Sequence, residues 1–330
     1  MVKIIKLYNN FKIKNQHKNS IILIGNFDGL HTGHQKLFNI AKNYKKKYSL
    51  KIGVLTFEPM PKMYFNDNLK NFRISSQQQK INYLNKLNVD FVITKKFDKK
   101  FSKTKSITFI KEIIGKKINP RFIFVSNNFK FGNKREGNVR ELIKYEKQYN
   151  YKIVKPQPSL VKKKVISSSL IRKYLQNGKL KDANKLLKRN WSIIGKVQKG
   201  KQLGKKIGFP TANIDIKDYI LAKPGVYVVK VQKLNSLNYI RGIANLGYRP
   251  TFNGKKVLLE IHLFNFSGNL YNKYLTVEFL KFIRSEKKFK NVDQLKKQIK
   301  IDLLIAKKTK WAKNKSIYLK QLFQWKLIYQ

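Results

Sequence analysis

The sequence predicts an α/β domain with a parallel sheet, followed by a small antiparallel β-barrel. In the first half, short apolar runs alternate with helical patterns, which is typical of a parallel sheet. In the second half, alternating runs are separated by turn signals, which is typical of an antiparallel barrel. The chain has 330 residues, which suits two cores better than one. We therefore predict two domains, residues 1–188 and 189–330.

The predicted strands of the first half are short runs of Ile, Leu, Val and Phe. They are Ile21–Ile24, Ile52–Phe57, Phe91–Ile93, Phe122–Val125 and Tyr151–Val154. Helical patterns separate them: one after His34, one over Gln77–Leu87, one through Ile107, Ile110 and Ile114, and one over Val139–Tyr149. Sheets of this kind bind ligands at the carboxyl ends of their strands, so the segments after each strand are candidate binding loops.

The predicted barrel begins near Trp191. Its strands are Trp191–Val197, Gly225–Val231, Arg241–Leu246, Val257–Phe264 and Leu275–Phe282. A final helix from Val292 carries Leu295, Ile299, Leu303 and Ile305 toward the core. The helical stretch Ser168–Arg189 forms the junction between the two domains.

Composition excludes several classes of protein. The chain has no cysteine, which excludes disulfides, thiolate zinc sites and cysteine nucleophiles. It has no signal-peptide pattern and no apolar run of the about 20 residues that span a membrane. We therefore expect a cytoplasmic protein that does not associate with membranes. No feature indicates an obligate protein partner.

The net charge is +56, from 73 Lys and Arg against 17 Asp and Glu. Such charge can indicate nucleic-acid binding, or a coding bias that places lysine on every surface. The basic residues form short runs in both halves, such as Lys45–Lys47 and Lys162–Lys164, and no nucleic-acid-binding motif accompanies them. We therefore favour the bias, and predict no specific nucleic-acid partner. The positive field would steer anionic substrates such as ATP.

The segment Gly25–His34 follows the first predicted strand and opens the first helix. A glycine-rich turn at a helix N-terminus presents backbone N–H groups that bind phosphate. His31 and His34 add two imidazoles, which can stabilise charge on a phosphate oxygen during transfer. Only four histidines occur in the chain, and two of them lie in this one turn, which argues against an incidental surface pair.

The H-x-G-H pattern resembles the nucleotidyltransferase superfamily, and the string G-N-F-D-G-x-H-x-G-H is similar to the prokaryotic FAD synthetases. Three more segments resemble that family: Leu55–Pro61, Val125–Gly132 and Ile166–Arg172. The resemblance implies that His31 and His34 are catalytic and that other residues bind the nucleotides: Gly25, Phe27, Asp28, Gly29, Gly33, Asn128, Ser168, Ser169 and Arg172. Ser168, Ser169 and Arg172 would hold ATP phosphates.

Two residues depart from that family pattern. Met60 stands where the family usually has histidine, and Ser126 where it usually has glycine. Methionine packs against a flavin ring but cannot donate to a phosphate. Serine adds a Cβ where the backbone would need a glycine conformation. Either change would weaken FMN binding.

The segment Gly200–Asn213 is the second candidate site. Three glycines and several lysines form a basic loop suited to covering phosphates, and Thr211 and Asn213 offer oxygen ligands for Mg²⁺. From these residues alone, a glycine-rich hairpin explains the pattern equally well. The segment resembles the riboflavin kinase signature G-x-x-x-G-x-x-x-G-F-P-T-A-N, and four later segments resemble that family in order: Pro224–Tyr227, Ala244–Phe252, Leu259–Phe264 and Phe282–Phe289.

This second resemblance implies that Gly200, Gly204 and Gly208 bind the nucleotide and that Thr211 and Asn213 hold Mg²⁺–ATP. It places Arg284 in a loop on the flavin side.

The riboflavin kinase resemblance, together with the scarcity of acids in the chain, implies that Glu260 is the catalytic base of the second site, whereas from this residue alone a solvent-facing Glu on an edge strand would be preferred. A ribityl hydroxyl is a poor nucleophile, so its phosphorylation requires a proton acceptor nearby. On an alternating strand, Glu260 and His262 share one face while Leu259 and Ile261 share the other.

The two resemblances together imply a bifunctional enzyme. Residues 1–188 would adenylylate FMN to FAD, residues 189–330 would phosphorylate riboflavin to FMN, and both would use ATP with Mg²⁺. Two alternatives stay open at this point: a riboflavin kinase whose first domain no longer adenylylates FMN, and a basic nucleic-acid-binding protein.

Overall fold

The computed structural model describes residues 4–66, 68–200, 202–233, 236, 238–251 and 254–310. The chain divides into two units, one of Met1–Lys70 with Gln77–Ser167 and the other of Asn71–Ser76 with Ser168–Gln330. The predicted junction helices therefore belong to the second unit. The division of activities between residues 188 and 189 stays a prediction.

The first unit contains a sheet of six parallel strands in the order β1-β4-β3-β2-β5-β8. All five predicted strands are present: β2 (Ile21–Ile24), β3 (Ile52–Glu58), β4 (Phe91–Lys96), β5 (Phe122–Phe124) and β8 (Lys152–Val154). The edge strand β1 (Lys6–Tyr8) was not predicted, because three residues that include a lysine give no apolar run. It pairs with β4 through Lys6 and Phe91.

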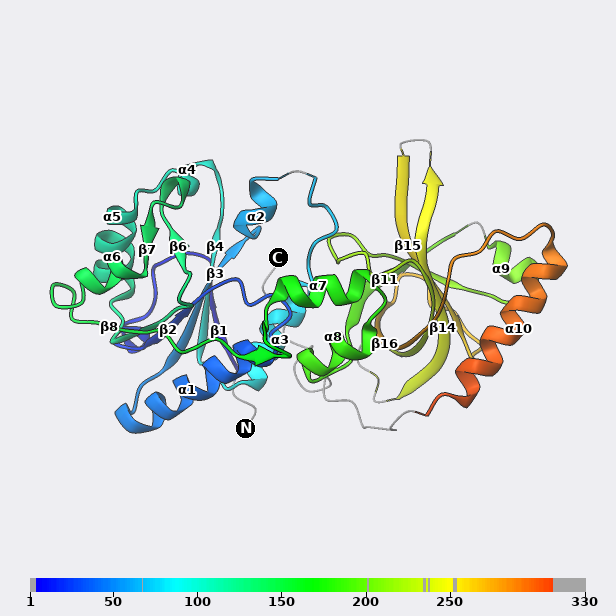
Figure 1. Cartoon of the computed structure of the whole chain (residues 1–330), viewed down its shortest axis with the longest axis horizontal. Helices are drawn as coiled ribbons and strands as arrows, with labels where there is room; N and C mark the ends of the chain where they lie inside the picture. The colour runs from blue at the N-terminus through cyan, green and yellow to red at the C-terminus, as the bar shows by residue number, and fades with distance from the viewer. Residues whose placement is uncertain are drawn as a thin grey trace. The chain divides into compact units, whose positions relative to one another are not determined.

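Helices cover this sheet (Figure 1). Helix α1 (Thr32–Tyr48) contacts β2 and β3 and buries Phe38 and Ala41. Helix α5 (Ser106–Thr108) continues into the π-helix η2 (Phe109–Ile118), which packs on Ile22, Ile24 and other sheet residues together with α6 (Val139–Lys144). Helix α3 (Gln77–Lys86) buries six consecutive residues. The fourth predicted helix ends at Lys144 rather than Tyr149, because turns occupy residues 145–150.

Shorter elements connect these layers. They are η1 (Asn15–His17), α2 (Pro61–Tyr64), α4 (Lys99–Ser102), β6 (Lys130–Phe131), η3 (Asn133–Arg135), β7 (Gly137–Asn138), β9 (Leu160–Val161) and β10 (Lys164–Val165).

The second unit contains a closed barrel in the order β11-β12-β15-β14-β13-β16, with antiparallel pairing throughout. Its strands are β11 (Ser192–Gln198), β12 (Ala212–Asp215), β13 (Gly225–Lys233), β14 (Tyr239–Thr251), β15 (Gly254–Leu263) and β16 (Tyr274–Ser285). An Asn-Gly turn signal at residues 253–254 also separates two predicted strands, and its Asn253 lies outside the described residues. Strand β12 was not predicted, although it is needed to close the barrel, because its four residues follow directly on the glycine-rich loop.

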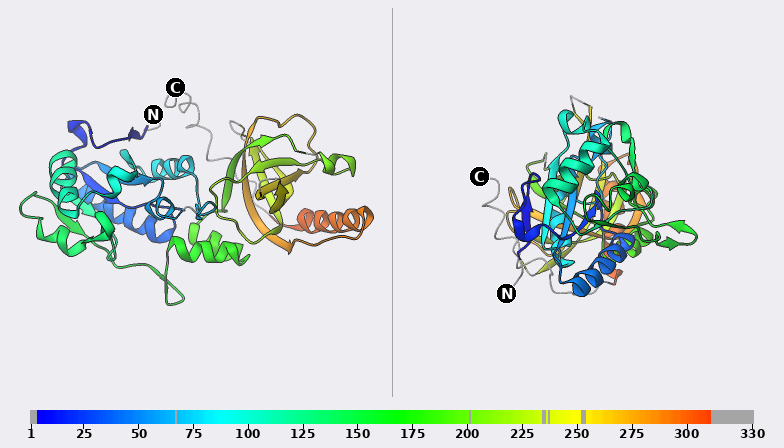
Figure 2. Two further views of the ribbon diagram at one scale, coloured as in Figure 1. Left: turned by 90° about the horizontal axis from the view of Figure 1, so that it is seen from above. Right: turned by 90° about the vertical axis from the view of Figure 1, so that its left-hand side faces the viewer.

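The barrel interior is filled by apolar side chains such as Ile214, Leu259, Val277 and Phe279. Helix α10 (Val292–Lys308) lies along the outside of the barrel, as Figure 2 shows. Its Ile299, Leu303 and Ala306 pack on Val226, Val228 and Ile243, as the helical pattern predicts. Leu295 and Ile305, which were also predicted to face the core, are partly exposed.

Helices α7 (Ser168–Gln176) and α8 (Leu180–Leu187) complete the second unit, together with the segment Asn71–Ser76. Trp191 donates from Nε1 to Ile74 O at 2.9 Å, and Phe72 N donates to Asp218 O at 2.9 Å. These bonds attach the 71–76 segment to the barrel.

Candidate active sites

The glycine-rich turn of the first unit joins the carboxyl end of β2 to α1. Phe27, Gly29 and Leu30 all have positive φ, at +49°, +77° and +40°. Only glycine adopts this region at low cost, so Phe27 and Leu30 depend on their burial to hold it. Asp28 is also buried. A Cβ at Gly33 would lie 3.2 Å from the His31 ring, which explains a glycine at that position.

The two predicted catalytic histidines stack at the start of α1. Their ring centroids are 3.6 Å apart, and Phe27 meets the His34 ring edge-on at 5.2 Å. His31 caps the helix because its Nδ1 accepts from His34 N at 3.3 Å, which places the hydrogen of neutral His31 on Nε2. Burial, with a smaller contribution from His31, holds the pKa of His34 well below its ordinary value of 6.5. His34 is therefore neutral at pH 7.

Three buried polar atoms in this turn have no hydrogen-bond partner among the described residues. They are Asn26 Oδ1, Thr32 Oγ1 and His34 Nδ1. Buried polar atoms are nearly always paired, so three in one turn indicate a site completed by a polar ligand or water. The turn presents donors at a helix N-terminus, which suits an anion.

Lys80, which the sequence did not single out, lies beside this turn. Lys80 is on α3 with only 4% of its surface exposed, and its Nζ donates to Thr56 Oγ1 at 3.1 Å and to Asn26 O at 3.4 Å. Thr56 lies near the carboxyl end of β3, and Asn26 belongs to the glycine-rich turn. The only signal in the sequence was one lysine on a predicted helix in a chain with 73 basic residues.

The two departures from the family pattern behave differently. Met60 is buried and caps the short helix α2. Ser126 does not have a positive φ, so its Cβ causes no strain of the kind expected from a lost glycine. Its Oγ donates to Asn128 Oδ1 at 2.9 Å on an exposed turn after β5.

Three predicted phosphate-binding residues, Ser168, Ser169 and Arg172, begin α7 in the second unit. Arg172 is held by the 71–76 segment. Its Nε donates to Phe72 O at 2.8 Å, and its guanidinium lies 3.6 Å from the centroid of the Phe72 ring. The first unit thus brings together the histidines and the glycine-rich turn, whereas these three residues belong to the second unit.

The glycine-rich loop of the second unit folds over β12. A Cβ at Gly200 would overlap the Asn213 side chain, and one at Gly204 would overlap Phe209 O. Gly208 has φ of +91°, a conformation that other residues rarely adopt. The short helix α9 (Leu203–Lys206) lies within the loop. Close approach and backbone conformation therefore account for all three glycines.

A row of directly opposed residues crosses four strand pairs of the barrel. Arg284 on β16 opposes Val226, Val226 opposes Asn245, Asn245 opposes Glu260, and Glu260 opposes Asn213 on β12. Opposed residues of an antiparallel pair share a face, so the predicted base and the predicted Mg²⁺ ligand are neighbours. Because Val226 packs against Ala306 of α10, this row lies on the outer face of the barrel.

Burial supports that placement. Leu259 and Ile261 are buried, whereas Glu260 and His262 are partly exposed. Asn213 Oδ1 is buried without a hydrogen-bond partner among the described residues, as expected of an atom that binds a ligand. His262 Nδ1 donates to Pro210 O at 2.9 Å and so holds the turn before Thr211. No role for His262 was predicted from the sequence.

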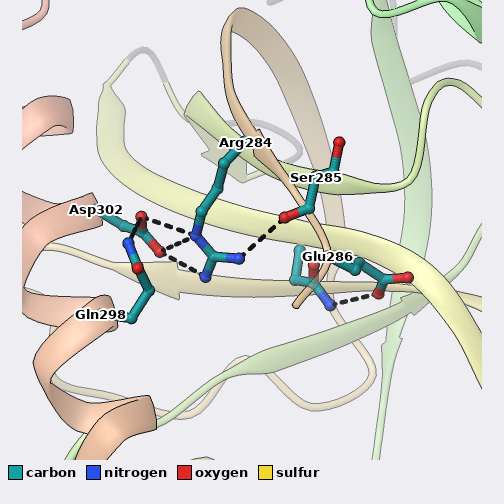
Figure 3. A network of polar contacts seen from close by, with 6 residues as sticks. Arg284, Ser285, Glu286, Gln298 and Asp302 are labelled. Carbon is teal, nitrogen blue, oxygen red and sulfur yellow. Dashed lines mark hydrogen bonds and ion pairs between the residues drawn. The ribbon is translucent and has the colours of Figure 1, made fainter. Parts of the chain in front are cut away.

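Arg284, which was predicted to lie on the flavin side, forms an ion pair with Asp302 of α10. Its Nη2 donates to Asp302 Oδ2 at 2.8 Å and its Nε to Asp302 Oδ1 at 3.0 Å (Figure 3). A contact between this guanidinium and a flavin stays a prediction.

Within the described ranges, no group of three or more His, Cys, Asp or Glu residues is arranged to hold a metal ion. A metal in the second unit would have to rely on hydroxyl and amide oxygens, which Mg²⁺ accepts together with substrate phosphates. The described part of the chain also contains no helix with the length and apolar character needed to cross a membrane.

Comparison with known proteins assigns both units. Residues 13–170 match the FAD synthetase family model and residues 187–310 match the riboflavin kinase model. The bifunctional riboflavin kinase/FMN adenylyltransferase of Buchnera aphidicola subsp. Schizaphis graminum is 40% identical over 93% of this chain and 98% of its own length. This chain belongs to the bifunctional riboflavin kinase/FMN adenylyltransferase family. The family resemblance and the fold class predicted from the sequence are confirmed.

A second member of the family matches most of the chain, and one solved structure shares its fold. The family member from Haemophilus influenzae is 40% identical over 87% of this chain and 92% of its own length. A crystal structure named "Macrolide-efflux Protein from Streptococcus pneumoniae" matches with a TM-score of 0.81 at 29% identity. That match covers 93% of this chain and 100% of the other, which shows a shared fold.

Proposed function

We propose that the chain phosphorylates riboflavin to FMN in its second unit and adenylylates FMN to FAD in the site built around His31 and His34. The observation that carries the proposal is that each unit has one glycine-rich turn with buried polar atoms lacking partners among the described residues: Asn26, Thr32 and His34 in one, and Asn213 in the other. Both turns bear the motifs of the family to which the chain belongs.

In the adenylylation, an FMN phosphate oxygen attacks the α-phosphorus of ATP, and the bond to the bridging oxygen breaks to release pyrophosphate. The attacking phosphate is already anionic, so no base is required. His31, neutral His34 and the N–H groups of the turn donate to the phosphate oxygens as charge develops. The buried ammonium of Lys80 adds a positive charge beside the turn. We assign Ser168, Ser169 and Arg172 to the phosphates by their match to the family motif.

In the phosphorylation, Glu260 accepts the proton of the terminal ribityl hydroxyl. The hydroxyl oxygen attacks the γ-phosphorus of ATP, and ADP leaves. The loop of Gly200, Gly204 and Gly208 covers the phosphates. Thr211 and Asn213 Oδ1, which has no hydrogen-bond partner in the described part of the chain, fit Mg²⁺, which prefers oxygen ligands and would neutralise phosphate charge when bound. Asn213 lies next to Glu260, so ATP and the base would meet on one face of the barrel.

Neither alternative is favoured. Met60 removes one donor expected from the family, but the stacked histidines and Lys80 remain. The +56 charge has no accompanying nucleic-acid motif. Use of Mg²⁺ and a cytoplasmic location remain part of the proposal.

Product analysis tests both activities at once. Purified chain with riboflavin, ATP and Mg²⁺ is expected to form FMN and then FAD. FMN without FAD, together with no FAD from added FMN, would contradict the adenylylation. An absence of FMN would contradict the phosphorylation.

A further inference from the structure

We propose that Asp302 of α10 is a positioning residue for riboflavin phosphorylation, acting through Arg284 and Glu286 on the strand row that holds Glu260. The proposal rests on the proposed function of Glu260 as the base. Three observations support it: the buried ion pair between Asp302 and Arg284, the segment that follows Arg284, and a side-chain contact from Glu286 to Asn245, the residue opposite Glu260.

The ion pair is shielded from solvent, most completely at Asp302. The Asp302 side chain is 1% exposed and that of Arg284 is 15% exposed. Arg284 Nη2 and Nε donate to the two carboxylate oxygens at 2.8 Å and 3.0 Å, and Gln298 Nε2 donates to Oδ1 at 3.0 Å (Figure 3). A guanidinium bound by two parallel hydrogen bonds is fixed in orientation as well as in position.

Arg284 transmits this constraint to the end of β16. Its Nη1 donates to the backbone carbonyl of Ser285 at 3.1 Å, which holds the last strand residue to the same guanidinium. Glu286 follows directly. The place at which the chain leaves the barrel is therefore set by α10 through one side chain.

The Glu286 side chain packs against β14. Its Oε1 accepts from Asn245 Nδ2 at 3.3 Å, and a Cβ at Gly247 would overlap the same carboxylate. The glycine thus leaves the space that Glu286 occupies. Asn245 is the residue directly opposite Glu260 on the next strand. Two carboxylates consequently flank Asn245, one of them the proposed base.

This arrangement predicts an effect on the rate of the chemical step. A general base works only within hydrogen-bond reach of the proton that it accepts, and small displacements reduce its efficiency strongly. If Arg284 lost its ion pair with Asp302, the segment that carries Glu286 would no longer be held in place. The contact between Glu286 and the Asn245 amide would then weaken, which would change the packing and charge beside Glu260. Asn213, the proposed Mg²⁺–ATP ligand, opposes Glu260 from the other neighbouring strand, β12, and would keep its position.

Asp302 could instead serve only to fasten α10 to the barrel, and Arg241 provides a matched control for that role. Arg241 Nη2 donates to the carbonyls of Ala306, Lys307 and Thr309 at 3.0, 3.1 and 2.6 Å. Arg241→Gln therefore loosens the same helix without touching Arg284.

The test compares Asp302→Asn, Arg284→Gln, the double variant and Arg241→Gln in the full chain, with FMN-to-FAD conversion as an internal control for folding. Asp302→Asn is expected to lower kcat for FMN formation about tenfold or more, with the KM for ATP unchanged. The double variant is expected to match Arg284→Gln, because coupled residues are not additive. Arg241→Gln is expected to keep the kcat of the wild type.

Hydrogen exchange of residues 285–290 without substrate provides a second readout, and it is expected to accelerate in Asp302→Asn but not in Arg241→Gln. Wild-type kcat and unchanged exchange in Asp302→Asn would overturn the proposal, as would an equal loss of kcat in Arg241→Gln. If wild-type chain makes no FMN, the proposed function fails, and the exchange experiment still decides whether Asp302 positions the segment.

Discussion

The imidazole rings of His31 and His34 lie nearly parallel, with centroids 3.6 Å apart and 19° between their planes. One ring caps α1 through Nδ1, and the other is kept neutral by burial and by the first. Two imidazoles this close disfavour a doubly charged state. In the proposed adenylylation, the pair would therefore act as hydrogen-bond donors to phosphate rather than as two fixed cations.

His31→Asn separates the catalytic role of that residue from its structural one. Asparagine caps helices well, so α1 is expected to keep its stability, whereas the donor to the phosphate is lost. We expect FAD formation from FMN to fall by about 10²–10³-fold, the loss seen when one charge-stabilising donor is removed. Steady-state FAD synthesis measures this, and unchanged FMN formation from riboflavin shows that the second unit is intact. Retention of adenylylation would exclude His31 from the site.

Glu260→Gln is expected to have the complementary effect. The amide keeps the shape of the side chain but cannot accept the hydroxyl proton, so FMN formation should fall by about 10²–10⁴-fold. FAD formation from added FMN should be unchanged. As a matched control, Glu112→Gln removes an exposed acid paired with Lys116 and should affect neither reaction. Loss of both reactions in Glu260→Gln would mean that the residue is structural.

Lys80→Met tests the buried lysine beside the glycine-rich turn. Methionine fills similar space without charge, so we expect FAD formation to fall about tenfold or more through lost charge stabilisation. Lys86→Met removes the same charge from an exposed position on the same helix and should have little effect. The two variants are compared by the KM for ATP and kcat of FAD synthesis, and equal effects would point to net charge rather than to the site.

His17 makes the stability of the first unit depend on pH. It is buried, its Nδ1 lies 2.7 Å from Tyr8 Oη, and its ring stacks on Phe91 at 4.4 Å. Burial lowers its pKa below 6.5, assisted by nearby lysines and opposed by Asp90. Between pH 6.5 and that lowered pKa, the unfolded chain binds a proton at His17 that the folded chain does not, so stability falls as the pH falls through this range.

We expect His17→Gln to be less stable than the wild type at pH 8, and to lose less stability between pH 8 and pH 5. Thermal unfolding followed at several pH values measures this difference. An equally steep loss in the variant would show that other groups, such as His34, carry the pH dependence.

The amino-acid sequence alone predicts the two glycine-rich motifs, the family and the strands that are buried on both faces. These features are local, because a run such as Ile21–Ile24 or the histidine pair is encoded in adjacent residues. It also determined that Glu260 and Leu259 face opposite ways, since alternation along a strand needs no knowledge of its neighbours.

The tertiary structure brings distant residues together. It buried Lys80 beside Asn26, 54 positions earlier in the chain, and paired Arg284 with Asp302 from the following helix. It placed Asn213 opposite Glu260 through β12, a strand too short to show an apolar pattern. Strand register, burial and ion pairs depend on how elements pack. The same lysine or arginine in a chain with 73 basic residues has no distinguishing local signal.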